Sequence, residues 1–490
     1  MIWGARVNPP CLEALEYTSS ISFDDRIAQD VVRINIAHTL MLVKQGIISP
    51  SEGRTLYRAL KRMLQGFELR HELEDVHMCL EEAVIREVGI NIGGKLHTGK
   101  SRNDQVATAL RMTAKRYIVN MALELLKLKE VLLDLCSRHV HTVMPGYTHL
   151  QHAQPVTLAH YLMAYYEKFR RDYDRLMRAY EVVDACPMGS GALAGSSFSI
   201  DRRYVAHLLG FSKIQDNTVD AVSDRDFMIE VGFCSLMIML HLSQLAEELV
   251  LWSTWEYGFA EIPDSYSSTS SIMPQKKNPT VAEVVRARAS HVLGMLISAL
   301  GIIKSLPLSY NLDLQEVTPP IWLSVEETLK ALKVMRGVVG GLQFDVRRMH
   351  EAAELGFSSA TELANELVRR YGIPFRVAHR IVGRVVKEAV DKGLTPSEVT
   401  PEMLMRAAKA EGYDLVISEE LLRESLDPVK CTLRSKVQGG PSPEEVFKLI
   451  DKRRAELEDQ FKKILKLEHE VNAIDERLSS EAKLLGVEEG

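Results

Sequence analysis

The chain has 490 residues, of which 46% are hydrophobic and 26% charged, a composition that supports a packed core and disfavours disorder. Its formal net charge of −6 argues against a general nucleic-acid-binding protein, because no excess of cations is available to displace counterions. The six cysteines lack C-x-x-C spacing, which favours neither a disulfide framework nor a zinc site and suits a reducing compartment.

Neither a targeting segment nor a membrane span is expected. The N-terminus, MIWGARVNPP, lacks a basic region followed by an apolar core, so it does not resemble a signal peptide. The most apolar long run, residues 227–252, contains charges such as Glu230 and Glu248 that are costly in lipid. We therefore predict a buried helix there and a cytoplasmic protein with no membrane or nucleic-acid partner.

Helical periodicity dominates the chain, and alternating β-type runs are nearly absent. Residues 24–48 and 50–66 are predicted as amphipathic helices, separated by the capping sequence ISPSEG. A glycine-rich loop over about 91–103 leads into a very long helix over about 104–141. Further long helices are predicted over roughly 155–184, 223–257, 279–306 and 320–351. Because average helices have only ~10–14 residues, such lengths predict a helix bundle, and more specifically an oligomeric one.

A smaller all-helical region is expected after Gly356, with turns at YGIP and GGPSP. Beyond the second turn, apolar residues recur at every seventh position, at Ile450, Leu457, Ile464, Val471 and Leu478. This spacing is typical of a short coiled-coil-like stripe, and an ordinary amphipathic helix packed on its own domain is an equal alternative.

These patterns predict an all-α fold in three mainly helical parts. The N-terminal helical domain is expected over 1–104 and the central long-helix bundle over 105–355. The C-terminal helical domain, with its heptad-like tail, is expected over 356–490.

The first polar segment at a helix boundary is HTGKSRNDQ, residues 97–105. Ser101 or Asn103 can cap the following helix, while Lys100 and Arg102 flank free backbone N–H groups. A helix N-terminus beside two cations favours a bound carboxylate or phosphate, and a plain capping loop is the alternative.

The second segment is MPGYTHLQHAQP, residues 144–155, interpreted as a proline-bounded loop. His149 and His152 are three positions apart without a third metal ligand nearby, so a metal site is not predicted. A histidine in a loop does not by itself indicate catalysis, because most such histidines only satisfy local hydrogen bonds. Near neutral pH, however, His149 is the side chain best suited to pass a proton.

The third segment, SSTSSIMPQKKNP, begins with five hydroxyl residues at 267–271 and resembles a flexible surface loop. A hydroxyl acts as a base only when cations or oriented N–H groups stabilise its ionised form. Lys276, Lys277 and the start of a helix near Asn278 provide such surroundings, and Glu283 on that helix could orient a histidine from another element. Removal of a proton next to a carboxylate requires this combination of base, acid and cations.

Together, these segments resemble the signature regions of the fumarase/aspartase superfamily and, in detail, those of the argininosuccinate lyases. Supporting matches are WGARV, TSSISFDDR, GSGALAGSSFSIDR, AVSDRD, LPLSYNLDLQE and ATELANELV, so that the resemblance covers about residues 1–465. It implies long central helices associating in a homotetramer. It also implies reversible cleavage of argininosuccinate into arginine and fumarate in arginine biosynthesis, with neither a metal nor an organic cofactor.

The resemblance also implies roles for individual residues. Ser270 corresponds to the base that takes the succinyl proton, and the hydroxyl tract to a mobile lid that delivers it. His149 corresponds to the proton relay or acid, oriented by Glu283, while Lys276 and Asn278 would hold the carboxylate whose charge grows in the intermediate. Substrate-binding positions are implied at Ser20, Asp24, Arg102, Asn103, Thr148, Arg225, Tyr310 and Gln315. In this pattern His149 and Ser270 of one site come from different chains.

The chain departs from the family pattern in four places. Thr269 stands where glycine is usual before the two serines, so Ser271 remains an alternative base. Thr318 stands where many relatives have a lysine that contacts substrate, and His152 replaces a usual arginine. The tail after about residue 465 extends beyond the usual end.

Two other functions remain open at this point. One is another fumarate-releasing lyase, acting on adenylosuccinate, malate or aspartate. The residue sequence of the motifs SRNDQ and PQKKNP favours argininosuccinate over these substrates. The other is a non-catalytic, crystallin-like structural protein. The presence together of His149, Ser270, Lys276 and Glu283 argues against that second alternative.

Overall fold

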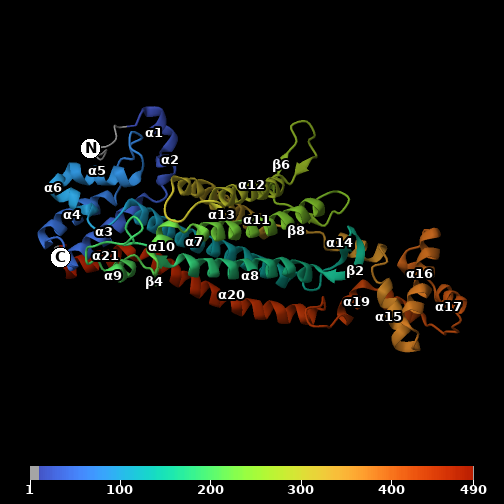
Figure 1. Cartoon of the computed structure of the whole chain (residues 1–490). Coiled ribbons are helices and arrows are strands. Elements are labelled where there is room, and N and C mark those ends of the chain that lie inside the picture. The colour runs from blue at the N-terminus through green and yellow to red at the C-terminus, as the bar shows by residue number, and fades with distance from the viewer. Residues whose placement is uncertain (1–9, 489–490) are drawn as a thin grey trace.

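Five long helices lie side by side along the centre of an elongated molecule (Figure 1). They are α7 (Arg102–Arg138), α8 (Leu158–Val183), α11 (Asp226–Trp252), α12 (Thr280–Ile303) and α13 (Thr318–Gly340). The computed structural model describes residues 10–488, so the WGARV match lies outside the described residues. The prediction of an all-α fold built on long central helices is confirmed.

The longest helix, α7, begins where the sequence predicted a cap. Ser101 Oγ accepts the N–H of Asn103 at 3.3 Å, and Asp104 Oδ1 accepts the N–H of Ser101 at 3.0 Å. These reciprocal bonds satisfy N–H groups that have no partner within the helix. The cap therefore fixes the point at which the HTGKSRNDQ segment turns into the bundle.

Short helices surround one end of the bundle. They are α1 (Leu12–Thr18), α2 (Ile21–Asp24), α3 (Ala28–Lys44), α4 (Pro50–Met63), α5 (Val76–Val88), α6 (Ile90–Gly93) and η1 (Gly94–His97), followed later by α9 (Arg202–Leu208) and α10 (Thr218–Ser223). The predicted helix over 24–48 is wrong at its start, because the chain turns between α2 and α3. The predicted glycine-rich loop is also partly wrong, since most of it forms the single turns α6 and η1. Ser49 caps α4 in a capping box with Glu52.

The helix predicted over 320–351 is broken. It ends at Gly340, and a second helix, α14 (Val346–Leu355), begins after the short strand β8 (Gln343–Phe344), which pairs with β5 (Ala260–Glu261). Two consecutive glycines, Gly340 and Gly341, weaken the helix at this point. Asp345 then starts α14, because its carboxylate accepts the N–H of Arg348 at 2.9 Å.

The MPGYTHLQHAQP segment is a β-hairpin, so its interpretation as a loop is wrong. Strands β1 (Val143–Thr148) and β2 (Gln151–Thr157) pair antiparallel, with an irregularity between Pro145 and Tyr147. Shorter pairs are β3 (Ala185–Cys186) with β4 (Lys213–Ile214), in parallel, and β6 (Ser268–Thr269) with β7 (Lys277–Asn278), antiparallel. Single turns of 3₁₀ helix lie at η2 (Asp264–Tyr266) and η3 (Leu312–Val317).

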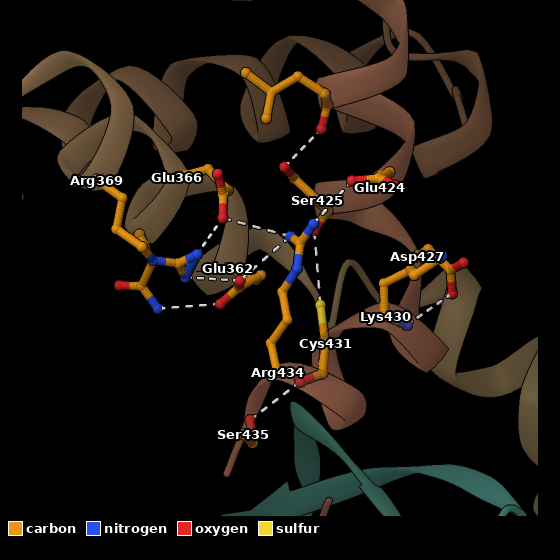
Figure 2. A network of polar contacts seen from close by, with 12 residues as sticks. Glu362, Glu366, Arg369, Glu424, Ser425, Asp427, Lys430, Cys431, Arg434 and Ser435 are labelled. Carbon is orange, nitrogen blue, oxygen red and sulfur yellow. Dashed lines mark hydrogen bonds and ion pairs between the residues drawn. The ribbon is translucent and has the colours of Figure 1, made fainter. Parts of the chain in front are cut away.

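A second, smaller hydrophobic cluster lies at the other end of the molecule. It is built by α15 (Ala360–Tyr371), α16 (Phe375–Asp391), α17 (Pro401–Ala410) and α18 (Glu419–Leu426), with η4 (Pro396–Glu398) and α19 (Pro428–Arg434) beside it. Figure 2 shows how α19 is held: Arg434 lies between Glu362 of α15, at 3.4 Å, and Glu424 of α18, at 2.9 Å. The three-part division of the chain predicted from sequence stays a prediction.

The C-terminal tail returns to the main bundle and does not pack on the small cluster. Helix α20 (Pro443–Asn472) runs along α7, and α21 (Ile474–Leu484) packs against α3 and α9 (Figure 1). Ile450, Leu457 and Ile464 are buried in the main core, but the chain bends at Ala473. The predicted stripe is therefore real over α20 and is not one continuous helix. Asp475, at the start of α21, accepts two bonds of 2.8 Å from Arg33 of α3.

Replacing Ile464 with aspartate is expected to destabilise the protein by more than about 3 kcal/mol, because an unpaired charge would enter a fully buried apolar position. Ile464 is 0% exposed. Thermal denaturation measures the effect, and Lys463→Asp, at the exposed neighbouring position, is the matched control. An equal melting temperature for both variants would indicate a solvated tail.

Helices α11 and α12 both have the length and apolar composition of a membrane span, yet they differ in burial. The most apolar window of α11 is 61% buried inside the bundle, as expected for the core helix predicted over 227–252. The corresponding window of α12 is only 22% buried. A large apolar surface of α12 is therefore uncovered in a single chain.

Candidate active site

A cavity of about 430 Å³ lies at the end of the bundle where α7 begins, beside α2, α5 and η3. It collects the predicted substrate-binding residues except Thr148: Ser20, Asp24, Arg102, Asn103, Arg225, Tyr310 and Gln315. Thr318 also lines it. Segments that are far apart in sequence therefore meet at one place, which we call the α7 cavity.

One wall of the α7 cavity is acidic. Asp24 is 7% exposed and accepts bonds from the Ser20 hydroxyl at 2.8 Å and the Val76 N–H at 2.9 Å. Burial raises the pKa of Asp24 to about 6, although both bonds oppose the shift. Glu74 and Asp75 lie beside it, and both pair with Arg102, at 3.0 and 3.2 Å. This wall suits a cationic group of a ligand.

A buried cation also lines this cavity. Arg225 is 3% exposed, donates to the Asp224 carbonyl at 2.7 Å, and has no partner for its Nε among residues 10–488. Burial lowers the pKa of Arg225 to about 10, so it remains charged at neutral pH. Burial raises the pKa of the nearby Tyr310 hydroxyl, which therefore stays neutral. Arg225 and Tyr310 together provide donors for a carboxylate.

Among the lining residues that sequence reasoning missed are three that are close together in the sequence at the start of α5: Glu74, Asp75 and His77. The signal was the sequence EDVH at the start of α5, where Asp75 caps the helix by accepting the Met78 N–H at 2.8 Å. Both ring nitrogens of His77 are buried without a partner among the described residues. Burial lowers the pKa of His77 to about 4, so its ring is neutral.

Lys100 lies behind the cavity wall, which corrects the prediction that it flanks an anion site. It is 9% exposed and donates to the side-chain oxygens of Asn35 and Gln105 beside a small inner cavity. Burial lowers the pKa of Lys100 to about 8. Its charge therefore supports the start of α7 from inside the protein.

Ser270 lies in the hairpin formed by β6 and β7, and the hydrogen bonds to its hydroxyl oxygen distinguish it from Ser271. Ser270 Oγ accepts the N–H groups of Met273 at 3.0 Å and Ile272 at 3.3 Å. Two N–H donors directed at one oxygen favour its ionised form. The structure records no corresponding bonds to Ser271 within the described residues.

The two adjacent lysines have different surroundings. Lys277 pairs with Glu261 of β5 at 2.9 Å and with Asp264 of η2 at 2.6 Å. It therefore fastens the base of the hairpin. Lys276 is exposed, with no side-chain partner recorded among residues 10–488. Asn278 is half-buried at the end of β7, and Glu283 is exposed in the first turn of α12.

His149 lies at the tip of the β1–β2 hairpin. Both residues of this two-residue turn, His149 and Leu150, have positive φ, at 56° and 57°. Such turns usually contain asparagine or glycine, because other side chains are strained there. The turn exposes Leu150 to 66% and presents His149 to the outside of the chain. Within residues 10–488, no three His, Cys, Asp or Glu side chains form the group that a metal ion would require.

One chain does not bring the predicted catalytic residues together. His149 lines a cavity between its hairpin, α8 and α11, while Asn278 lines another beside β5. Neither cavity shares a residue with the α7 cavity. Figure 1 shows β2 and β6 well away from α2 along the bundle. A single chain therefore presents parts of a site in separate places.

Family models match most of the chain. Residues 13–294 match the model described as "Lyase", and residues 357–432 match "Argininosuccinate lyase C-terminal". Among solved structures, EDDS lyase in complex with formate has a TM-score of 0.89 and 30% identity, over 98% of this chain and 96% of that chain. A class II fumarase from Schistosoma mansoni, with a TM-score of 0.71 and 16% identity over 87% and 96%, shares the fold. The fold and these matches define the chain as a lyase.

Curated relatives identify the family more closely. The argininosuccinate lyase of Methanothermobacter thermautotrophicus is 45% identical, over 92% of this chain and 97% of that protein. That of Methanothrix thermoacetophila is 42% identical, over 98% of each. The chain belongs to the argininosuccinate lyase family, and the resemblance inferred from the signature segments is confirmed.

Replacing Thr318 with lysine is expected to lower KM by roughly fivefold with little change in kcat. A change of roughly fivefold in KM corresponds to an added ion pair of ~1 kcal/mol. Thr318 lines the α7 cavity, so a lysine there would reach a carboxylate of the ligand. Steady-state kinetics measure the change, and Thr318→Met, which adds length without charge, is the control. An unchanged or raised KM for Thr318→Lys would mean that other donors already fill this role.

Proposed function

We propose that this protein is an argininosuccinate lyase that cleaves argininosuccinate reversibly into arginine and fumarate, without a metal or organic cofactor. The observation that carries the proposal is the α7 cavity, which is lined both by Arg225, able to bind a carboxylate, and by the acidic group of Asp24, Glu74 and Asp75. Such a cavity suits a ligand that carries both carboxylates and a guanidinium group. The reaction would serve arginine biosynthesis in the cytoplasm.

Ser270 is the proposed base. As an alkoxide, held by the N–H groups of Ile272 and Met273, it takes the proton from the succinyl carbon next to a carboxylate. The electron pair left on that carbon forms the double bond of fumarate as the carbon–nitrogen bond breaks. Lys276 and Asn278 stabilise the charge that grows on the carboxylate in the intermediate.

His149 is the proposed acid, and it gives a proton to the departing guanidinium nitrogen. Glu283 orients its ring, as a carboxylate does for a catalytic histidine in other enzymes. The hairpin around Ser270 would act as a lid. Its residues are mostly exposed in the single chain, and its closure over substrate would exclude water from the reacting carbon.

A homotetramer is proposed because two central helices keep apolar faces uncovered. On α12, Leu293, Ile297 and Leu300 are 45%, 58% and 40% exposed. Their spacing of four and three residues places them on one side of the helix. Phe233 and Leu240 of α11 are also exposed, seven residues apart. Copies of the same chain, packed through these faces, would bury them as in symmetric bundles.

Association would also complete the active site. The β1–β2 hairpin of one chain and the β6–β7 lid of another can approach the α7 cavity of a third only when long helices pack side by side. We therefore propose that Thr148 and His149 come from one chain, Ser270, Lys276, Asn278 and Glu283 from a second, and the residues of the α7 cavity from a third.

Purified protein tests the reaction directly. Addition of argininosuccinate is expected to raise the ultraviolet absorbance of fumarate, with arginine appearing in equal amount. Adenylosuccinate, malate and aspartate are the comparison substrates. Fumarate released from one of these, and not from argininosuccinate, would replace the proposed substrate. No fumarate from any of them would favour a structural role.

A further inference from the structure

The turn that carries His149 is strained, and something must hold it. His149 and Leu150 both have positive φ, at 56° and 57°, a region that histidine enters more often than most residues but that a bulky residue such as leucine seldom occupies. Such conformations persist only where the surrounding structure leaves no alternative. The tip itself is exposed, so the restraint has to act on the two strands below it.

The nearest restraint across the hairpin is the pair of Tyr147 and His152. These residues are partners in the β1–β2 ladder, directly inside the pair that closes the turn. Their rings meet edge-to-face, with centroids 5.2 Å apart, and Tyr147 Oη lies 3.4 Å from His152 Nε2. Tyr147 in turn lies against the rings of Tyr257 and Phe259. One side of the His152 ring is therefore fixed to the bundle.

The other side of the His152 ring lies against Gly356, the residue that ends α14. A Cβ atom built on Gly356 would overlap Nδ1 and Cγ of the His152 ring. Gly356 has φ −84° and ψ 10°, a backbone conformation open to other residues. The backbone conformation therefore does not require glycine at position 356. Glycine is required because the His152 ring occupies the space that a side chain would need.

The elements behind this contact are themselves anchored. Helix α14 packs on β1, and α19 packs on both strands of the hairpin. Arg434 ties α19 to Glu362 and Glu424 of the small C-terminal cluster (Figure 2). Next to Gly356, Phe357 also has positive φ, at 51°. The hairpin is held from its base toward its tip.

We propose that His152 is a positioning residue for catalysis: its ring, fitted between Tyr147 and Gly356, sets the place of the turn that carries His149. This inference rests on the proposed function, in which His149 donates a proton. A displaced ring would tilt β2, and His149 lies only three residues along the chain. Small displacements of an acid from its reaction partner reduce the rate strongly while leaving substrate binding intact.

Replacing Gly356 with alanine tests the proposal, because the new methyl group meets the His152 ring without straining the backbone. We expect kcat to fall by roughly ten- to hundredfold, with KM within about twofold of the wild-type value, since the α7 cavity is untouched. Gly383→Ala is the matched control. Gly383 lies inside α16 with nothing near its Cβ position, so kcat should not change.

A double-mutant cycle separates positioning from general damage. His152→Ala alone should lower kcat, because the ring no longer fixes the strands. Gly356→Ala should then have no further effect in the His152→Ala background, because its methyl group has nothing to displace. Effects that multiply would show that the two residues act independently and would overturn the proposal. His152→Ala also provides the test if Gly356→Ala does not fold.

Crystal structures of both glycine variants give a readout that is independent of activity. The Cα atom of His149 should move in Gly356→Ala and stay in place in Gly383→Ala. An unmoved turn in Gly356→Ala overturns the proposal whatever the activity. Wild-type protein that does not cleave argininosuccinate contradicts the proposed function instead. Wild-type activity that Gly356→Ala fully retains contradicts only the role of His152.

Discussion

Replacing Ser270 with alanine is expected to lower kcat by roughly 10²–10⁴-fold, the usual contribution of a positioned base, while substrate still binds. The hydroxyl oxygen accepts two N–H groups, from Ile272 and Met273, which favour its ionised form. Alanine removes that oxygen and leaves the residues of the α7 cavity in place. Fumarate release measures kcat, and equilibrium binding of argininosuccinate to the variant measures the retained affinity.

Ser271→Ala is the matched control, because it removes the neighbouring hydroxyl, for which the described residues show no such N–H donors. It should retain most of the wild-type kcat. If Ser271→Ala is inactive and Ser270→Ala turns over normally, the base is Ser271, and the donors at Ser270 only shape the lid. Normal turnover in both variants would mean that neither serine is the base.

Mixing two inactive variants is expected to restore about a quarter of the wild-type activity. His149→Asn and Ser270→Ala proteins, each inactive alone, are denatured together in equal amounts and reassembled. In a random mixture, half of the chains carry an intact His149 and the other half an intact Ser270. If each site takes these residues from different chains, a site has both intact with a probability of roughly one half times one half.

The controls for this experiment are reassembly of each variant alone, which should stay inactive, and differently tagged subunits, which show whether mixed oligomers form. The expectation follows from the proposed assembly, in which His149 and Ser270 of one site come from different chains. Mixed oligomers that remain inactive would show that each site takes both residues from the same chain. Activity recovered without mixed oligomers would point to contaminating wild-type protein.

Local signals in the sequence were sufficient for the helical fold and for the family. The cap at Ser101 and the long apolar repeats of α7 and α11 depend on contacts within a few residues or one turn. These features depend only on residues that are close together in the sequence, so the sequence predicts them with small errors at the helix ends. The signature segments around Ser270 and His149 also identified the family, because their residue order is specific.

Tertiary structure decided the features that depend on distant partners. Lys100 is turned inward by Asn35 and Gln105, and the turn at His149 exists because two strands pair and elements far along the chain support them. Periodicity cannot show which surface a helix meets, so it left open whether the stripe of α20 is coiled-coil-like or packs on its own domain. In the fold, α20 runs along α7.

Only the fold brings together the residues that line the α7 cavity, and only the fold separates His149 from that cavity. The physical reason is that sequence patterns encode which faces are apolar, whereas the choice among apolar partners depends on packing over the whole chain.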